Sequence, residues 1–297
     1  EDDCKQTLLQ IHGERHGLTL ANRFANSFPA AYQEDFPGAM AADDVQVLAG
    51  LSSAVPMAVR LYRPLDSTQG LLRFKIFSVK KVALSDSLPV LERMGARVLD
   101  EHPYRIGDNE DALWIHDLGL QLPVTVELSV VKARFEALFA QAWRGEVESD
   151  DLNKLVLCTT LDARAITVLR AYTRYFKQLG FAYSQSYIET TLNKNAGIAR
   201  EISELFTLRF DPSLAGDRDS AQKQLADQIE AHLNAVESLD EDHILRQFFA
   251  TVVATARTNL WQKSAGGGPK PYLSFKLKPR KVPGVPEPKP LFEIWVY

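Results

Sequence analysis

The sequence contains few residues that form covalent or metal crosslinks. Only two of its 297 residues are cysteines, Cys4 and Cys158, and they stand far apart. This spacing excludes a disulfide framework and the paired cysteines of a zinc site. Cys158 lies in the apolar stretch KLVLCTTL without a neighbouring base, which favours a buried structural thiol. A reducing, cytoplasmic location is the simplest interpretation.

Long apolar runs and an excess of positive charge are also missing. No run approaches the roughly 18 apolar residues that a membrane helix needs, and the acidic start EDDCKQ is unlike a signal peptide. Charged residues make up 24% and apolar residues 45% of the chain, as in ordinary globular proteins. Because the net charge is −4, we expect no general attraction to nucleic acid or to anionic membranes.

Motifs for cofactor and metal binding are absent or incomplete. No Gly-x-Gly-x-x-Gly occurs, so we expect no NAD site in this segment. The stretch HGERH places His12 and His16 four residues apart around Glu14, but a solvated helix end explains it better than a metal site, since Gly13 weakens the helix and a third ligand is missing. The glycines at 266–268 lack the strand-to-helix setting of a phosphate loop and indicate a linker. We assign no catalytic, cofactor-binding or metal-binding residue and leave binding residues unknown.

Two groups of polar residues raise the question of binding surfaces. The first, a basic cluster beside two aromatic residues, consists of Lys276, Lys278, Arg280 and Lys281. On a net acidic chain it favours a solvated strand edge over a nucleic-acid contact. The second group consists of Tyr187, Glu189, Thr190, Asn193, Lys194 and Asn195. A contact surface and ordinary helix capping and packing explain this second group about equally well.

The most regular part of the sequence predicts a small α/β unit. The stretch PMAVRLYRP at 56–64 alternates like a strand that stops at Pro64, and residues 70–79 predict a strand with Leu72, Phe74 and Ile76 on one face. A helix follows, with Leu84, Leu88 and Leu91 directed toward the core and Gly95 as its stop. Two further strands, at 96–106 and 112–120, are separated by the turn sequence GDNED.

Helices are predicted on both sides of this unit. The first 55 residues predict helices, and after residue 123 helices are predicted at 129–145, 162–180, 195–210 and 238–261. Ser238 and Glu241 have the spacing of a capping box at the start of the last helix. Near the C-terminus, Leu273, Phe275 and Leu277 alternate as in a half-buried strand. Phe292, Ile294 and Val296 repeat this pattern.

Whole phrases of the sequence resemble the very large bacterial NAD-specific glutamate dehydrogenases. They are LYRP…GLLRFKIFSVKKVALSDSLPVLERMGARVLDEHPYRI…ALWIHDLGL, VLRAYTRYFKQLGFAYSQSYIETTLNKNAGIARE and PYLSFKLKPRKVPGVPEPKPLFEIWVY. The resemblance covers about residues 15–297. It implies the N-terminal regulatory half of such an enzyme, with ACT-like modules of the order β-α-β-β-α-β followed by helical motifs. We expect the chain to end as it enters the catalytic portion.

The resemblance sets the fold, the domains and the function that we expect. The fold class is α+β, with an ACT-like (ferredoxin-like) α/β sandwich, a mostly helical domain and C-terminal strands. The expected segments are a helical linker at 1–55, the ACT-like domain at 56–125, the helical domain at 126–265, and a linker with strands at 266–297. The resemblance implies that the full-length protein oxidatively deaminates L-glutamate with NAD and forms a homo-oligomer.

Two hypotheses for this segment follow. In the first, it is a noncatalytic regulatory and assembly segment whose partners are other domains or subunits of the same enzyme. In the second, it is a free-standing ACT-like module that senses an amino acid. The turn SVKKVALSD between the first strand and the first helix of the ACT-like unit contains no glycine, unlike that of most amino-acid-sensing ACT units. This difference favours an architectural role.

Overall fold

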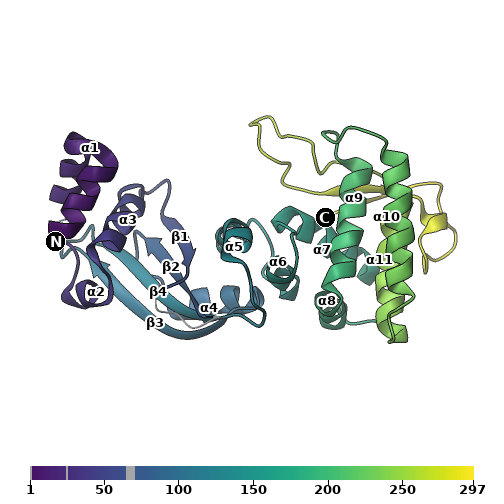
Figure 1. Cartoon of the computed structure of the whole chain (residues 1–297). Helices are drawn as coiled ribbons and strands as arrows, with labels where there is room; N and C mark the ends of the chain where they lie inside the picture. The colour runs from purple at the N-terminus through teal and green to yellow at the C-terminus, as the bar shows by residue number, and fades with distance from the viewer. Residues whose placement is uncertain (1, 25, 65–70) are drawn as a thin grey trace. The chain divides into compact units, whose positions relative to one another are not determined.

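The computed structural model describes residues 2–24, 26–64 and 71–297. The chain divides into two compact units, Glu1–Glu148 and Ser149–Tyr297 (Figure 1). Helices accompany a four-stranded sheet in the first unit and a three-stranded sheet in the second, which confirms the α+β class. No helix in the described ranges is long and apolar enough to cross a membrane.

The first unit contains two groups of helices and one antiparallel sheet. Its elements are α1 (Asp2–Phe24), α2 (Ala30–Asp35), α3 (Gly38–Ala49), β1 (Met57–Tyr62), β2 (Leu71–Ser78), α4 (Leu84–Arg93), β3 (Arg97–Ile106), β4 (Leu113–Gln121) and α5 (Leu128–Trp143). Gly70, the first residue of the expected strand at 70–79, lies outside the described residues.

The sheet has the order β1-β2-β4-β3, with every pair antiparallel. From β2 to α5 the elements follow the expected order β-α-β-β-α, and the last strand of an ACT-like unit does not follow α5. Instead β1, which precedes β2 in sequence, pairs along the edge beside it. The backbone N–H of Leu61 on β1 donates to Oε1 of Glu136 on α5 at 2.7 Å. This contact ties the added strand to the second helix.

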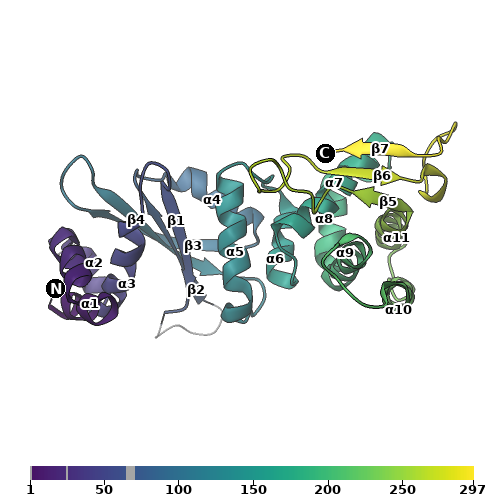
Figure 2. The same cartoon turned by 90° about the horizontal axis from the view of Figure 1, so that it is seen from above.

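One face of this sheet forms the apolar core predicted from the sequence. Leu72, Phe74 and Ile76 of β2 are all buried. The ring of Phe74 packs edge-on against Phe135 and Phe139 of α5, with centroid distances of 5.7 and 4.8 Å. Figure 2 shows α5 along this face of the sheet.

The predicted inward face of α4 is only partly correct. Leu91 is fully buried and Leu88 is half-buried, but Leu84 is 37% exposed. Leu84 is the first residue of α4, where the end of a helix is least covered by its neighbours. The core contribution of this helix therefore comes from its C-terminal half.

The other face of the sheet is covered by the N-terminal helices. Phe77, Tyr104 and Ile115 of the sheet share one buried cluster with Leu20, Val45 and Leu48 of α1 and α3. Figure 2 shows the three helices on the side of the sheet opposite α5. The first unit thus has three layers, since helices cover both faces of a single sheet.

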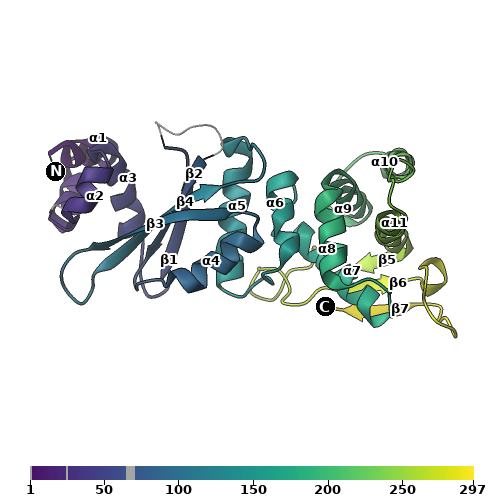
Figure 3. The same ribbon diagram turned by 90° about the horizontal axis from the view of Figure 1, so that it is seen from below.

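The second unit is mostly helical and closes with short strands. Its elements are η1 (Asp151–Lys154), α6 (Leu155–Cys158), α7 (Ala163–Gln178), α8 (Gln185–Lys194), α9 (Ala196–Phe210), α10 (Arg218–Leu233), α11 (Leu239–Ala254), β5 (Thr255–Thr258), β6 (Ser274–Leu277), η2 (Pro279–Lys281) and β7 (Glu293–Val296). The strands form an antiparallel sheet in the order β5-β6-β7, which lies beside α7 in Figure 3.

The last predicted helix is shorter than expected. The hydrogen bond from Glu241 N–H to Ser238 Oγ at 3.4 Å confirms Ser238 as the N-cap, while the Glu241 carboxylate bonds to Lys194 and Asn195. The helix ends at Ala254, however, and Thr255 has extended backbone angles (φ −68°, ψ 130°). Residues 255–258 pair with β6 instead. Threonines at 255 and 258 favour a strand, because β-branched side chains lose rotamer freedom in a helix.

The C-terminal strands differ in which side chains they bury. Leu273, Phe275 and Leu277 are buried, as their alternation predicts. In β7 the expected apolar set faces outward instead, with Phe292 40%, Ile294 61% and Val296 54% exposed. Glu293 and Trp295 occupy the inner side. Both are held there by polar bonds to α7, described below, which periodicity alone does not predict.

We expect Phe74→Ala to lower the free energy of unfolding of the first unit by about 3–5 kcal/mol, because it removes a fully buried ring from between the sheet and α5. Leu99→Ala is the matched control, since Leu99 is 47% exposed and should change stability by no more than about 0.5 kcal/mol. Urea unfolding followed by circular dichroism measures both. A loss below about 1 kcal/mol for Phe74→Ala would contradict this core.

Candidate functional site

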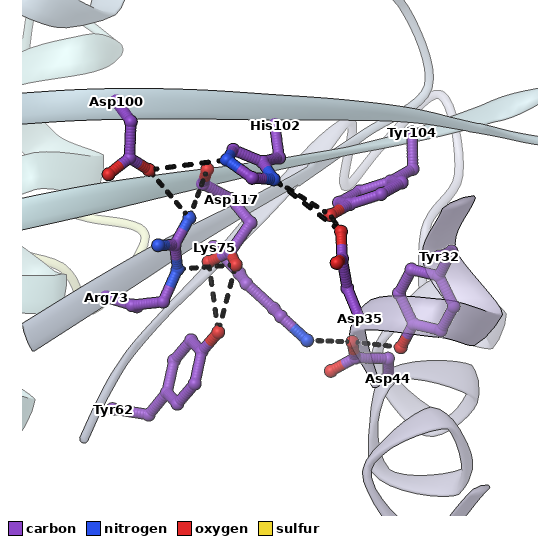
Figure 4. Close-up of polar contacts among 10 residues, drawn as sticks. All are labelled: Tyr32, Asp35, Asp44, Tyr62, Arg73, Lys75, Asp100, His102, Tyr104 and Asp117. Carbon is purple, nitrogen blue, oxygen red and sulfur yellow. Dashed lines mark hydrogen bonds and ion pairs between the residues drawn. The ribbon is translucent and has the colours of Figure 1, made fainter. Parts of the chain in front are cut away.

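A network of charged and aromatic side chains lies between the sheet of the first unit and α2 and α3. Along β2, Arg73 and Lys75 point to the face opposite Phe74, because successive side chains of a strand alternate between faces. Figure 4 shows the ten residues of this polar network, which are Tyr32, Asp35, Asp44, Tyr62, Arg73, Lys75, Asp100, His102, Tyr104 and Asp117. The first three come from α2 and α3, and the others from the sheet.

The centre of the network is an ion pair between Lys75 Nζ and Asp44 Oδ2. Both side chains are almost completely buried, at 1% and 0% exposure. Asp44 also accepts a hydrogen bond from the Tyr32 hydroxyl at 2.7 Å and pairs with Arg60 at 3.3 Å. Burial lowers the pKa of Lys75, while the carboxylate of Asp44 opposes this shift. The lysine thus depends on Asp44 for its charge balance.

Aromatic rings surround the ammonium group of Lys75. Its Nζ atom lies 3.8 Å from the ring centroid of Phe36, 5.3 Å from that of Tyr62 and 5.5 Å from that of Tyr32. A cation is attracted to the faces of such rings at these distances. The rings also exclude water, which strengthens the ion pair with Asp44.

A second buried carboxylate, Asp117 on β4, is held entirely by the sheet. Arg73 Nε donates to its Oδ2 at 2.7 Å, and the Tyr62 hydroxyl bonds to both carboxylate oxygens at 3.0 and 3.1 Å. Burial raises the pKa of Asp117, although the positive charges of Arg73 and Lys75 counteract this effect. Arg73 also reaches Asp100 at 3.0 Å, which connects the buried part of the network to its exposed rim.

The rim consists of half-exposed residues around His102. The side chains of His102, Asp100 and Asp35 are 48%, 45% and 45% exposed. His102 Nδ1 lies 3.6 Å from Asp35 on α2, and His102 Nε2 lies 3.7 Å from Asp100 on β3. The Tyr104 hydroxyl bonds to Asp35, and this bond lowers the pKa of that carboxyl group.

The network has the chemistry of an interface. None of its ten residues has a buried side-chain nitrogen or oxygen atom without a partner. The buried carboxylates of Asp44 and Asp117 are engaged by cations and hydroxyls, and the ammonium group of Lys75 is enclosed by rings. A cavity of about 380 Å³ lies among α1, α2 and α3, and Tyr32 and Phe36 contribute to its wall.

A second polar contact closes the turn between β2 and α4. His116 on β4 is buried, and its Nε2 accepts the backbone N–H of Val82 at 3.1 Å. Since an amide N–H only donates, the ring proton lies on Nδ1, which bonds to Glu101 Oε1 at 2.7 Å. The Val82 amide, which belongs to the glycine-free turn SVKKVALSD, therefore already has a hydrogen-bond acceptor within the protein.

The glycines and histidines considered from the sequence lie apart from the polar network. His12 and His16 are in contact, with ring centroids 5.4 Å apart, but Gly13 leaves the helical conformation between them (φ 74°, ψ 170°). No group of three metal-ligating side chains occurs in the described part of the chain. The glycines at 266–268 lie in the loop between β5 and β6, where Ser264 N–H bonds to Gly268 O at 2.7 Å.

The prediction for Cys158 is wrong. It is exposed, whereas its neighbours Leu155, Val156 and Leu157 are buried. The apolar run that contains it forms a single helical turn, so successive side chains point in different directions, and the last one points outward. An apolar neighbourhood in sequence did not place this thiol in the core.

The basic cluster of the second unit is mostly exposed, whereas most residues of the polar stretch make contacts within the protein. Lys276 lies 3.9 Å above the ring of Phe292, and Lys278, Arg280 and Lys281 are exposed. In the polar stretch, Lys194 pairs with Glu241 at 2.6 Å, and Asn195 donates to the same carboxylate at 3.2 Å. Asn193 donates to the backbone carbonyl of Asp151 at 2.8 Å. The remaining residues of the stretch are Glu189, which is buried, Tyr187, which is half-buried, and Thr190, which is exposed.

Comparisons with known proteins place recognised modules along the chain. Residues 7–51 match the family described as glutamate dehydrogenase, helical motif 2, and residues 56–132 match its ACT3 domain. Residues 147–212 match helical motif 3, and residues 228–297 match the catalytic domain of bacterial NAD-glutamate dehydrogenase. The catalytic-domain match thus includes α11 and all strands of the second sheet.

Three relatives resemble the chain over nearly its whole length. The NAD-specific glutamate dehydrogenase of Halomonas elongata is 38% identical over 299 residues, which cover 99% of this chain and 18% of the relative. That of Pseudomonas aeruginosa is 36% identical and covers 100% of the chain and 19% of the relative. That of Mycobacterium tuberculosis is 33% identical over 293 residues, which cover 95% of this chain and 18% of the relative.

The fold is therefore that of an ACT-like sheet enclosed by helices, followed by a helical unit with a small sheet. The chain is a segment related to the large NAD-specific glutamate dehydrogenases, and it spans less than a fifth of the length of these relatives. The resemblance predicted from its sequence is confirmed. The polar network joins two of its modules, since Asp44 lies in the stretch that matches helical motif 2 and Lys75 in the ACT3 domain.

We expect Asp44→Asn to destabilise the first unit by about 3–5 kcal/mol, because it leaves the buried ammonium of Lys75 without its carboxylate. Adding Lys75→Met should restore at least about 2 kcal/mol of this loss, since an apolar side chain needs no counter-charge. Urea unfolding measures both variants.

Asp43→Asn is the matched control for this pair. Asp43 is exposed and adjacent in sequence, so its neutralisation should change stability by no more than about 0.5 kcal/mol. Simple additivity of the Asp44 and Lys75 changes would show that the two side chains are not coupled.

Proposed function

We propose that this chain is a noncatalytic regulatory and assembly segment of a cytoplasmic enzyme that oxidatively deaminates L-glutamate to 2-oxoglutarate and ammonia, with NAD as the oxidant. The supporting observation is the polar network, which fastens the helices that match helical motif 2 to the sheet that matches the ACT3 domain. A buried ion pair specifies how two surfaces fit, because any other alignment leaves a charge without its partner.

The second unit supports an assembly role in the same way. The Tyr175 hydroxyl on α7 donates to Glu293 Oε2 on β7 at 2.8 Å. Trp295 Nε1, also on β7, donates to the carbonyl of Ala171 on α7 at 3.1 Å. Because α7 lies in the match to helical motif 3 and β7 in the match to the catalytic domain, these bonds link a helical motif directly to catalytic-domain sequence.

The outward face of β7 fits a partner within the same enzyme. β7 is an edge strand, and Ile294 and Val296 on it, together with Phe292 just before it, are between 40% and 61% exposed. Exposed edges with apolar side chains promote association unless they are covered. We propose that further residues of the catalytic domain cover this face, because the match to that domain includes β7 and the relatives are about five times longer than this chain.

A free-standing sensor of amino acids is less well supported. The Val82 amide in the turn beside α4 is bonded to His116, and α1–α3 cover the sheet face opposite α5. Both features occupy surfaces that a small ligand or a second ACT-like sheet would need. The architectural interpretation therefore accounts for more of the described contacts.

The whole protein should reduce NAD when supplied with L-glutamate, whereas this segment alone should neither bind NAD nor turn over glutamate, because the dinucleotide-binding glycine motif is absent from it. The increase in NADH absorbance measures the reaction of the whole protein. Calorimetric titration of the segment with NAD and with L-glutamate measures binding. Saturable micromolar NAD binding to the segment would refute the noncatalytic role, and glutamate binding alone would favour the sensor. An inactive whole protein would refute the proposed reaction.

The segment alone should self-associate through the uncovered face of β7, and the double change Ile294→Lys and Val296→Lys should reduce this association by placing two charges on that face. Analytical ultracentrifugation gives the mass. Val253→Lys on α11 is the control, since Val253 is also partly exposed, at 38%, and belongs to another surface. An equal effect of the control, or a monomeric parent segment, would count against β7 as a docking surface.

A further inference from the structure

The cavity among α1, α2 and α3 has a row of aromatic rings in its wall. The ring centroids of Phe28 and Tyr32 are 4.6 Å apart, and those of Tyr32 and Phe36 are 4.7 Å apart. Phe24, at the end of α1, adds a fourth ring to the wall. Aromatic rings attract one another in tilted and edge-on arrangements at such distances. A further ring inside the cavity would therefore extend the row.

Two of these rings are fixed by residues that do not line the cavity. The Tyr32 hydroxyl donates to Asp44 Oδ2 at 2.7 Å, and the ring centroid of Phe36 lies 3.8 Å from Nζ of Lys75. Asp44 and Lys75 are in turn held together as a buried ion pair. The polar network therefore keeps part of the cavity wall in place before a ligand enters. A pre-organised site loses less free energy to ordering when it binds.

The size and polarity of the cavity suit a small ring compound. Its volume is about 380 Å³, whereas an apolar cavity of roughly 150 Å³ already binds benzene. Leu8, Ala41 and Val45 add buried apolar surface to the wall. Asp3 and Lys5 also line the cavity, and both are exposed. An aromatic body can thus be buried while a polar substituent stays beside solvent, as in most small-molecule sites.

We propose that this cavity is a binding site for a small aromatic molecule, the size of a benzene or indole ring system. The ligand packs on the rings of Phe28, Tyr32 and Phe36, and its polar group lies beside Asp3 and Lys5. Most of the lining residues belong to the stretch that matches helical motif 2, so the site gives this module a role besides assembly. The site lies in the first unit alone and does not depend on the reaction proposed for the whole protein.

Alkylation of Cys4 in the 297-residue chain measures whether the cavity is occupied, with indole as the probe. Cys4 is half-buried in the cavity wall, whereas Cys158 is exposed in the second unit and serves as an internal control. Labelling by N-ethylmaleimide is quantified for each cysteine by peptide mass spectrometry. Labelling of Cys4 should slow by about tenfold at an indole concentration of about ten times its Kd, because only the unoccupied chain reacts. The rate at Cys158 should stay constant.

Three variants connect this protection to the cavity. Ala41→Leu fills part of the cavity from α3 and should abolish the protection of Cys4. Ala39→Leu is the matched control, because Ala39 is exposed on the same helix, and it should retain the response of the parent chain. Phe28→Ala removes one ring from the row and remains informative if Ala41→Leu perturbs folding. It should raise the Kd for indole about threefold to tenfold, as expected for the loss of one contact between rings.

Several results would overturn the proposal. They are a Cys4 rate that indole leaves unchanged, an equal slowing at Cys158, and protection that persists undiminished in both Ala41→Leu and Phe28→Ala. The same labelling of the whole protein tests a different occupant. If Cys4 is protected there without indole and indole adds nothing, a neighbouring segment of the protein fills the cavity, and the small-molecule site is refuted.

Discussion

The first unit depends on the neutralisation of one buried positive charge. Lys75 lies on β2, which pairs with a strand on each side, so its side chain cannot reach water around an edge. Its ammonium group needs a counter-charge in that position, and Asp44 of α3 supplies it. The sheet and the N-terminal helices therefore stabilise one another, because separating them would expose apolar surface and leave both charges without their partner.

This constraint shows how modules that are distinct in sequence become one folded unit. Helical motif 2 and the ACT3 domain are separate families of sequence, yet Tyr32 and Asp44 of the former complete the polar network of the latter. The contacts between α7 and β7 repeat this arrangement in the second unit, with Tyr175 and Trp295 as the linking side chains. Each unit thus contains residues that match two different modules. Regulatory and assembly functions benefit from such contacts, since a change in one module alters the stability of the other.

Periodicity predicted the strands of the first unit, β6, β7 and most helices, but it predicted neither β5 nor the polar network. The alternation of Leu72, Phe74 and Ile76 reveals the buried face of β2, because those residues are apolar. Lys75 lies between Phe74 and Ile76, and the alternation predicts that it faces solvent. It is buried because the tertiary fold places α3 over the face of the sheet opposite α5. Asp44 likewise reads as a polar helix residue in the stretch AADDV. The same limitation explains β7, where Glu293 turns inward because Tyr175, over a hundred residues earlier in the sequence, donates to it.

The most direct test of this account is to cut the connection between α3 and β1. Residues 52–55 form an exposed turn there, with bonds between Ser52 and Val55. A protease site inserted between Ser53 and Ala54 would leave every contact of the polar network intact. After cleavage, the N-terminal helices should remain bound to the rest of the chain through gel filtration at neutral pH. Release of the helical fragment under those conditions would show that the ion pair and its surroundings do not hold the two modules together.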